Sequence, residues 1–167
     1  MKIFKHFILV ILVILISKNA ISQNVAINVV TQNAGIVKNG ELIFFEVVIY
    51  NTSATKVVSK HKLRPQISFP TPLVSVQETG HVLPKDWAII SNAKGVVTLS
   101  NGTDNIGQND SRTILISIKG NELGGPSTIS SNLLFSNGIE PGSASGISTM
   151  GDNLADNISS STIMVVK

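Results

Sequence analysis

Apolar and polar residues alternate along two long segments of the chain. In residues 41–51 (ELIFFEVVIYN) and 111–119 (SRTILISIK), nearly every second residue is apolar. A period of two is typical of a β-strand that buries one face and exposes the other. The residues expected in the core are Ile43, Phe45, Val47, Ile114, Ile116 and Ile118. Ser117 falls on the opposite face of its strand.

Shorter segments of the same kind follow one another along the chain, separated by turn residues. They are residues 24–30, 64–69, 87–91, 95–100, 128–136 and 161–166. Clusters such as Lys38-Asn39-Gly40, Asn101-Gly102 and Asn137-Gly138 supply the residues that tight turns favour. About eight short strands without helical periodicity predict an all-β fold, a two-sheet antiparallel β-sandwich. A β-barrel is the structural alternative.

The first 22 residues have a different pattern. Lys2 and Lys5 precede an unbroken apolar run at residues 7–16, and Ala20-Ile21-Ser22 places small residues where a signal peptidase reads the chain. The run is too short to span a bilayer as a helix. We expect a signal peptide at residues 1–22, cleaved before Gln23, and a single domain at residues 23–167. The product is then secreted (extracellular, periplasmic or surface-associated) and has no stable membrane span.

Removal of this segment changes the charge balance. The first 22 residues carry three of the 13 Lys and Arg residues and none of the ten Asp and Glu residues. The remaining chain is therefore neutral overall, whereas nucleic-acid binders show a basic excess, so we expect no nucleic-acid partner. The chain has no cysteine, which removes disulfides and thiolate metal ligands from consideration. An exported chain without disulfides favours a bacterial source.

Several short motifs resemble one family. A Gly precedes a long apolar strand that ends in Asn-Thr (residues 40–52), and a Leu-Pro pair precedes Trp87. An Ile-Gly loop leads to the Ser-Arg-Thr strand at 111–119, and an Asp/Asn-rich loop at 152–157 precedes the last strand. This order resembles the immunoglobulin-like module of bacterial surface proteins catalogued as domain of unknown function eleven. The family's Asp before the Leu-Pro pair is missing here. The resemblance implies that the fold is an immunoglobulin-like two-sheet antiparallel β-sandwich with a structural or adhesive surface role, and it carries over no catalytic residue.

The chain offers little for catalysis. His61 lies between two lysines and His81 follows a glycine, so these two histidines, the ones outside residues 1–22, are expected in ordinary loops. No Gly-x-Ser-x-Gly elbow, phosphate loop or dinucleotide fingerprint occurs. We therefore predict that the protein is not an enzyme, and a small secreted hydrolase ranks as the third hypothesis. Trp87 is expected between the sheets, although an exposed Trp87 would favour sugar stacking.

Two loops rich in Asp and Asn are the candidate metal sites. Calcium prefers carboxylate and carbonyl oxygens, and the residues that could supply them are Asp104, Asp110, Asp152 and Asp156. Asp and Asn are also favoured turn residues, which explains both loops without a ligand. The prediction is no cofactor, with calcium as the possible exception.

The leading functional hypothesis is an exported, non-enzymatic module with a structural or adhesive role at the bacterial cell envelope or outside the cell. The alternative is a ligand-binding module, for glycan or calcium, that uses the loops at one end of the sandwich. Expected partners are an envelope or extracellular protein, or weak self-association. If successive strands run antiparallel, residues 101–110 and 137–160 form an acidic end, and residues 51–63, 92–94 and 120–126 a basic end. Such a bipolar molecule would associate weakly head to tail or dock its basic end on an acidic partner. The alternative explanation is that charged residues simply collect in loops.

Overall fold

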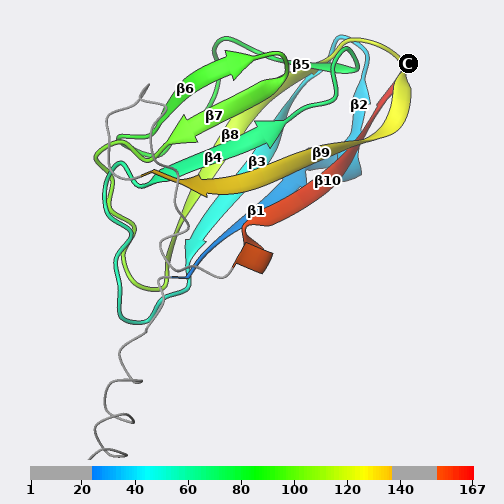
Figure 1. Cartoon of the computed structure of the whole chain (residues 1–167). Helices are drawn as coiled ribbons and strands as arrows, with labels where there is room; N and C mark the ends of the chain where they lie inside the picture. The colour runs from blue at the N-terminus through cyan, green and yellow to red at the C-terminus, as the bar shows by residue number, and fades with distance from the viewer. Residues whose placement is uncertain (1–23, 137–153) are drawn as a thin grey trace, which may run out of the picture.

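In the computed structural model, which describes residues 24–136 and 154–167, two β-sheets pack face to face (Figure 1). One sheet, sheet A, has the strand order β1-β3-β8-β5, and the other, sheet B, has the order β2-β10-β9-β4-β7-β6. The strands are β1 (Val25–Thr31), β2 (Ile36–Lys38), β3 (Leu42–Asn51), β4 (Leu63–Ser68), β5 (Val74–Val76), β6 (Ala88–Ala93), β7 (Val96–Ser100), β8 (Asp110–Gly120), β9 (Gly124–Phe135) and β10 (Ile158–Val166). Two short 3-10 turns, η2 (Gln32–Gly35) and η3 (Leu154–Asp156), complete the described part. The immunoglobulin-like sandwich is confirmed, and the barrel alternative is wrong because the two sheets are separate.

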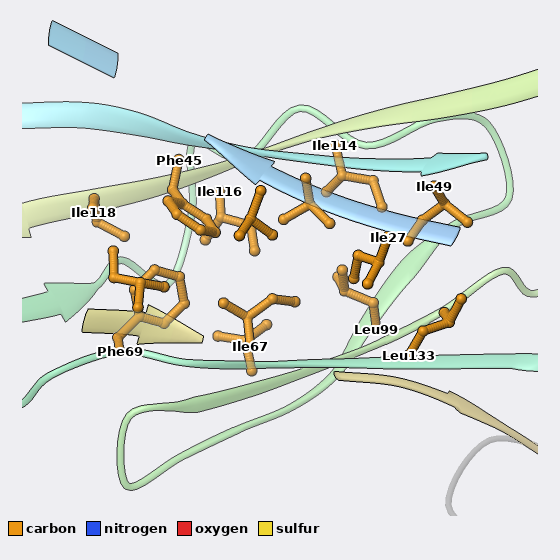
Figure 2. Close-up of a cluster of buried hydrophobic side chains, with 14 of the residues drawn as sticks. Ile27, Phe45, Ile49, Ile67, Phe69, Leu99, Ile114, Ile116, Ile118 and Leu133 are labelled. Carbon is orange, nitrogen blue, oxygen red and sulfur yellow. The ribbon is translucent and has the colours of Figure 1, made fainter. Parts of the chain in front are cut away.

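The core fills the space between the sheets, as the alternating pattern predicted. The six expected core residues are all buried, with exposed fractions of 6% or less. Figure 2 shows side chains of β3 and β8, among them Phe45 and Ile116, pointing toward Ile67 of β4 and Leu99 of β7. Phe45 contacts Phe69 edge to face, with ring centroids 5.3 Å apart. Trp87 is 6% exposed and belongs to the same core, which confirms its expected burial.

Ser117 does lie on the opposite face of β8 from the core, but it is buried as well. The segment after β5 covers it, because Gln77 N–H donates to the Ser117 carbonyl and Val82 pairs with Leu115. Between these two contacts, the Nδ1 atom of His81 accepts the Ser117 N–H at 3.1 Å. The imidazole thus occupies the place of a backbone carbonyl in the ladder. His81 is therefore a structural residue and not a solvated one.

Two short strands were not predicted. β2 and β5 have three residues each, too few for a period to be visible in the sequence. β2 also pairs parallel to β10, in a sheet whose other pairs are antiparallel. Gly35 permits this arrangement, since its φ is +80° and a Cβ there would lie 2.2 Å from the Thr162 carbonyl oxygen. The described residues thus form ten strands where about eight were expected.

The missed strand β5 makes the predicted bipolar charge distribution wrong. Because β5 carries the chain back across the sandwich once more, the loops at 52–62 and 101–109 meet at one end instead of lying at opposite ends. Val58 pairs with Ile106, and Lys60 N–H donates to the Asn105 side chain at 2.9 Å. Lysines and aspartates are therefore intermixed at this end, and the charges give no basis for head-to-tail association.

Some predictions fall on other parts of the chain. The signal peptide at 1–22, most of the long loop at 138–160 and Asp152 lie outside the described residues, so they stay predictions. Within the described residues, the structure has no helix that is long and apolar enough to cross a membrane.

Candidate functional site

The two loops at residues 52–62 and 101–109, here called the loop end, are fixed by a pair of buried asparagines. The Asn51 amide, at the end of β3, donates to the carbonyl oxygens of Lys56 (2.8 Å), Ile106 (3.1 Å) and Gly107 (2.8 Å). Its own Oδ1 accepts the Ser53 N–H. One side chain therefore ties both loops to the last residue of a central strand.

Asn101 plays the same part at the end of β7. Its Oδ1 accepts the N–H of Leu63 at 3.0 Å, and its amide donates to the carbonyl oxygens of Ser59 and Asp104. Asn101 is completely buried, so these bonds satisfy groups that water does not reach. The loop end is thus a rigid structure and not a set of loose connections.

Asp104 is the centre of the loop end's charged contacts. Its carboxylate accepts Nε of Arg112 at 2.7 Å, Nη2 of the same guanidinium at 3.1 Å, and Nε1 of Trp87 at 2.7 Å. The side chains of Arg112 and Asp104 are only 22% and 15% exposed. This bidentate, partly buried pair is the stronger kind of charged hydrogen bond. It joins β8 to the core tryptophan.

Asp110 binds the same guanidinium on its solvent-facing side. Its carboxylate accepts Nη1 of Arg112 at 2.6 Å, and its side chain is half exposed. The hydrogen bond from Arg112 holds the pKa of Asp110 below its ordinary value. The hydrogen bond from Arg112 to Asp104 raises the pKa of Arg112. Burial of the guanidinium acts to lower the same pKa, but its effect is smaller.

The predicted calcium ligands are therefore only partly brought together. Asp104 and Asp110 do converge, but on a guanidinium, which supplies the positive charge that a cation would bring. Asp156 lies in η3, where its buried Oδ1 has no hydrogen-bond partner, and Asp152 lies outside the described residues. Calcium binding stays a prediction for these residues.

Arg112 is the main residue of the loop end that the sequence analysis missed. A signal for it was present, because Arg112 lies in register with the buried isoleucines of β8. An arginine on the core-facing side of a strand needs an acidic partner nearby. The two asparagines carried no comparable signal, since Asn is also an ordinary residue at strand ends and turns.

The outer face of sheet A is the first candidate interaction surface. The strand registers align Val30 of β1, Glu46 of β3, Leu115 of β8 and Val82 in one row across the sheet. Further apolar side chains of β3 lie on the same face on both sides of this row. These are Leu42, Phe44, Val48 and Tyr50. We call these eight residues the apolar face.

Large apolar side chains on this face are open to solvent. The exposed fractions are 59% for Leu42, 53% for Val82, 46% for Val30 and 39% for Tyr50. The outer face of an antiparallel sheet is commonly polar when it faces only water. Exposed apolar residues that lie together mark interaction sites more often than single ones do. Glu46 is the one carboxylate within the row, and the polar neighbours of the apolar side chains on this face include Asn28, Thr113 and Lys119.

The outer face of sheet B differs in chemistry. A shallow groove of about 350 Å³ runs over β4, β9 and β10, and its lining consists of hydroxyl, amide and apolar groups. Gln66 and Asn132 are direct cross-strand neighbours there, as are Ser68 and Ser130. Ile158, 66% exposed, lies beside Asn132. Arg64 is buried at the end of this face, and burial lowers the pKa of its guanidinium.

Comparison with known proteins shows the fold and nothing more specific. No family model and no curated protein matches the sequence, so the resemblance to domain of unknown function eleven is not confirmed. A chain of the complex between CaDoc0917 and CaCohA2 is similar over 86% of this chain and 100% of its own length, with 12% identity and a TM-score of 0.52. The full-length major pilin SpaD from Corynebacterium diphtheriae is similar over 83% of this chain and 33% of its own, with 11% identity and a TM-score of 0.50. The CARDB domain of the PF1109 protein from Pyrococcus furiosus is similar over 87% and 90%, with 9% identity and a TM-score of 0.46. The chain has the immunoglobulin-like β-sandwich fold.

Proposed function

We propose that the protein is an exported, non-enzymatic β-sandwich module with a structural or adhesive role at the bacterial cell envelope or outside the cell. Its apolar face binds an envelope or extracellular protein. The observation that carries this proposal is the row Val30–Glu46–Leu115–Val82, together with the exposed apolar side chains on both sides of it.

The chemistry of the row indicates what kind of surface the partner presents. Val30 and Leu115 flank Glu46 on neighbouring strands, so a bound partner would remove all three from water together. Burial of the apolar side chains stabilises such a complex by about 25 cal/mol per Å². Burial of the Glu46 carboxylate is costly unless it is paired. The partner is therefore a protein with an apolar surface and a Lys or Arg placed against Glu46.

The polar groups of the described residues support a structural role. The two carboxylates near Trp87 are bound to Arg112, and the His81 ring is bound to the backbone of β8. A hydrolase needs a nucleophile within hydrogen-bond reach of a base. Asp104 and Asp110 are both paired with Arg112, an arrangement that braces the fold.

The test is capture of partners from envelope extracts by the purified protein and by face variants. Val30→Lys and Val82→Lys each place a charge on the apolar face. Ser160→Lys and Thr162→Lys place the same charge at exposed positions of β10 on the outer face of sheet B and serve as matched controls. We expect one protein to be retained by the wild type and both controls and lost in both face variants. Equal capture by all five proteins, or no capture at all, would overturn the proposal.

The groove on sheet B favours a second candidate, a binding site for neutral glycans. Its amides and hydroxyls match the hydrogen-bonding groups of an uncharged sugar, and Ile158 offers an apolar contact. In this candidate the glycan binds on a sheet face, whereas the sequence analysis expected the loops at one end of the sandwich; Trp87 at the loop end is buried. Isothermal titration with neutral and acidic polysaccharides tests it. Binding of neutral but not acidic polysaccharides, lost in Asn132→Lys, supports this candidate. No heat of binding with either class of polysaccharide refutes it.

A further inference from the structure

β6 is an edge strand of sheet B and differs from the other edges. At the edge of sheet A, Ser159 and Ser161 of β10 cover the N–H groups of Val29 and Thr31 in β1. β2 and β5, the remaining edge strands of the described part, have three residues each. β6 has six residues, exposed or half-buried, with no charged residue and no proline. Of the devices that protect an edge from pairing, β6 lacks charged residues, proline and short length, and it has one, the bulge between Ile89 and Ser91.

The backbone of β6 has hydrogen-bonding groups that point away from β7. Ala93 and Val96 close a two-residue hairpin turn and form its first pair. Because hydrogen-bonded and non-hydrogen-bonded pairs alternate in an antiparallel ladder, the N–H and C=O of the next residue, Asn92, face outward. A bulge between Ile89 and Ser91 shifts the register by one residue. The next outward-facing N–H and C=O groups therefore belong to Ile89, whereas in a regular strand they would belong to Ile90.

A groove next to this edge can receive side chains from an added strand. It has a volume of about 480 Å³ and lies between β6 and the segment that follows β5. Ile89, Ile90 and Asn92 line it from β6, and Gln77, Glu78, His81 and Leu83 line it from the segment that follows β5. Any strand that pairs with β6 would extend sheet B and cover this groove. Its core-facing side chains would then contact the opposite sheet.

We propose that a second copy of this chain occupies the edge, with the two β6 strands paired antiparallel about a twofold axis. Such pairing places the hairpin turn at Lys94 of one copy across from residues 86–88 of the other. Asp86 and Lys94 are both exposed, and the arrangement brings their opposite charges together twice, once on each side of the axis. In each copy, Asp86 lies one residue closer than Lys85 to Lys94 of the other copy, so the nearer charge is the attractive one. β6 itself carries no charge that would repel its copy.

The resulting dimer is an isologous one, in which sheet B continues from one copy into the next. Main-chain hydrogen bonds supply the attraction, as in other cases of strand addition. The pairing uses neither the apolar face nor the groove on the outer face of sheet B. This inference therefore does not depend on the proposed function.

The first test is sedimentation equilibrium of the purified protein over a range of concentrations. Asn92→Pro removes an N–H that β7 does not use, so it blocks pairing between copies while the β6–β7 ladder persists. We expect a monomer–dimer equilibrium in the wild type and at least tenfold weaker association in Asn92→Pro. Circular dichroism and the fluorescence of Trp87 confirm that the variant is folded. A wild type that is monomeric at every concentration overturns the proposal, even if it binds an extended peptide at this edge. A dimer that Asn92→Pro leaves unchanged also overturns it.

A charge exchange tests the register. Asp86→Lys and Lys94→Glu should each weaken association by roughly two- to thirtyfold, the range for exposed ion pairs made twice. The double variant restores the complementary charges in reversed order, so its affinity should return to that of the wild type. Both positions have a positive φ, so each exchange keeps a side chain in a similar backbone conformation. Additive loss in the double variant overturns the proposed register.

Discussion

Replacement of Asp104 by Asn removes one negative charge from the centre of the loop end without a change in side-chain size. The carboxylate accepts three N–H groups, two from Arg112 and one from Trp87. An amide oxygen in the place of Oδ2 can still accept Nε of Arg112 and Nε1 of Trp87, but the NH₂ group then faces Nη2 of Arg112. One bond is therefore lost, and the other two no longer end on a charged acceptor. A hydrogen bond to a charged group contributes about 1.5–3 kcal/mol when intact. Since the pair is partly exposed, we expect a total loss of about 2–4 kcal/mol in the free energy of unfolding.

Asp110→Asn is the matched control, because it makes the same chemical change on the outer side of the same guanidinium. Asp110 is half exposed, so its loss should cost only about 0–1 kcal/mol. Equilibrium unfolding in urea measures both variants, and Trp87, the only tryptophan of the chain, reports on the loop end directly. Equal losses in the two variants would show that Asp104 does not brace the core. A rise in stability on addition of calcium that both variants abolish would support a calcium site at these two residues.

Three further predictions concern the core, pH and export. Ile116→Ala should lower the free energy of unfolding by about 2–5 kcal/mol, whereas Ser117→Ala should cost far less; similar losses in urea unfolding would contradict the assigned faces of β8. Arg112 lowers the pKa of Asp110 from 3.8, so the stability that this pair adds is complete above 3.8 and is lost as the pH falls through the lower folded-state value. The difference in unfolding free energy between wild type and Asp110→Asn should therefore vanish in acid, and a difference that persists there would refute the pairing. The intact mass of the exported product should correspond to a chain that begins at Gln23, and a membrane-bound product that retains Met1 would show that residues 1–22 are not cleaved.

Much of the fold could be predicted because both long strands carry a clear period of two. In residues 41–51 and 111–119 the buried and exposed faces alternate, so the core residues followed directly. β2 and β5 have three residues each, and their pairing depends on partners distant in the sequence. Because β5 was missed, the direction of every later strand relative to residues 51–63 was inverted. One short strand thus decided where the charged loops lie.

The candidate surfaces were less predictable than the core. Leu115 and Tyr50 were visible as apolar residues on the polar side of their strands, but only the register shows that they share a face with Val30 and Val82. The partners of Asp104 depend on how the loop at 101–109 returns to β8. Sequence spacing does not determine such tertiary hydrogen bonds. The acids therefore suggested a cation, where the structure places a guanidinium.

Site-specific photocrosslinking in living cells tests the apolar face most directly. A photoreactive residue at Val30 or Tyr50 reports from the apolar face, and one at Ser160 reports from the outer face of sheet B. If the apolar face binds an envelope protein, Val30 and Tyr50 should yield the same crosslinked species and Ser160 none. Crosslinks of equal yield from both faces, or none from Val30 and Tyr50, would contradict the proposed function.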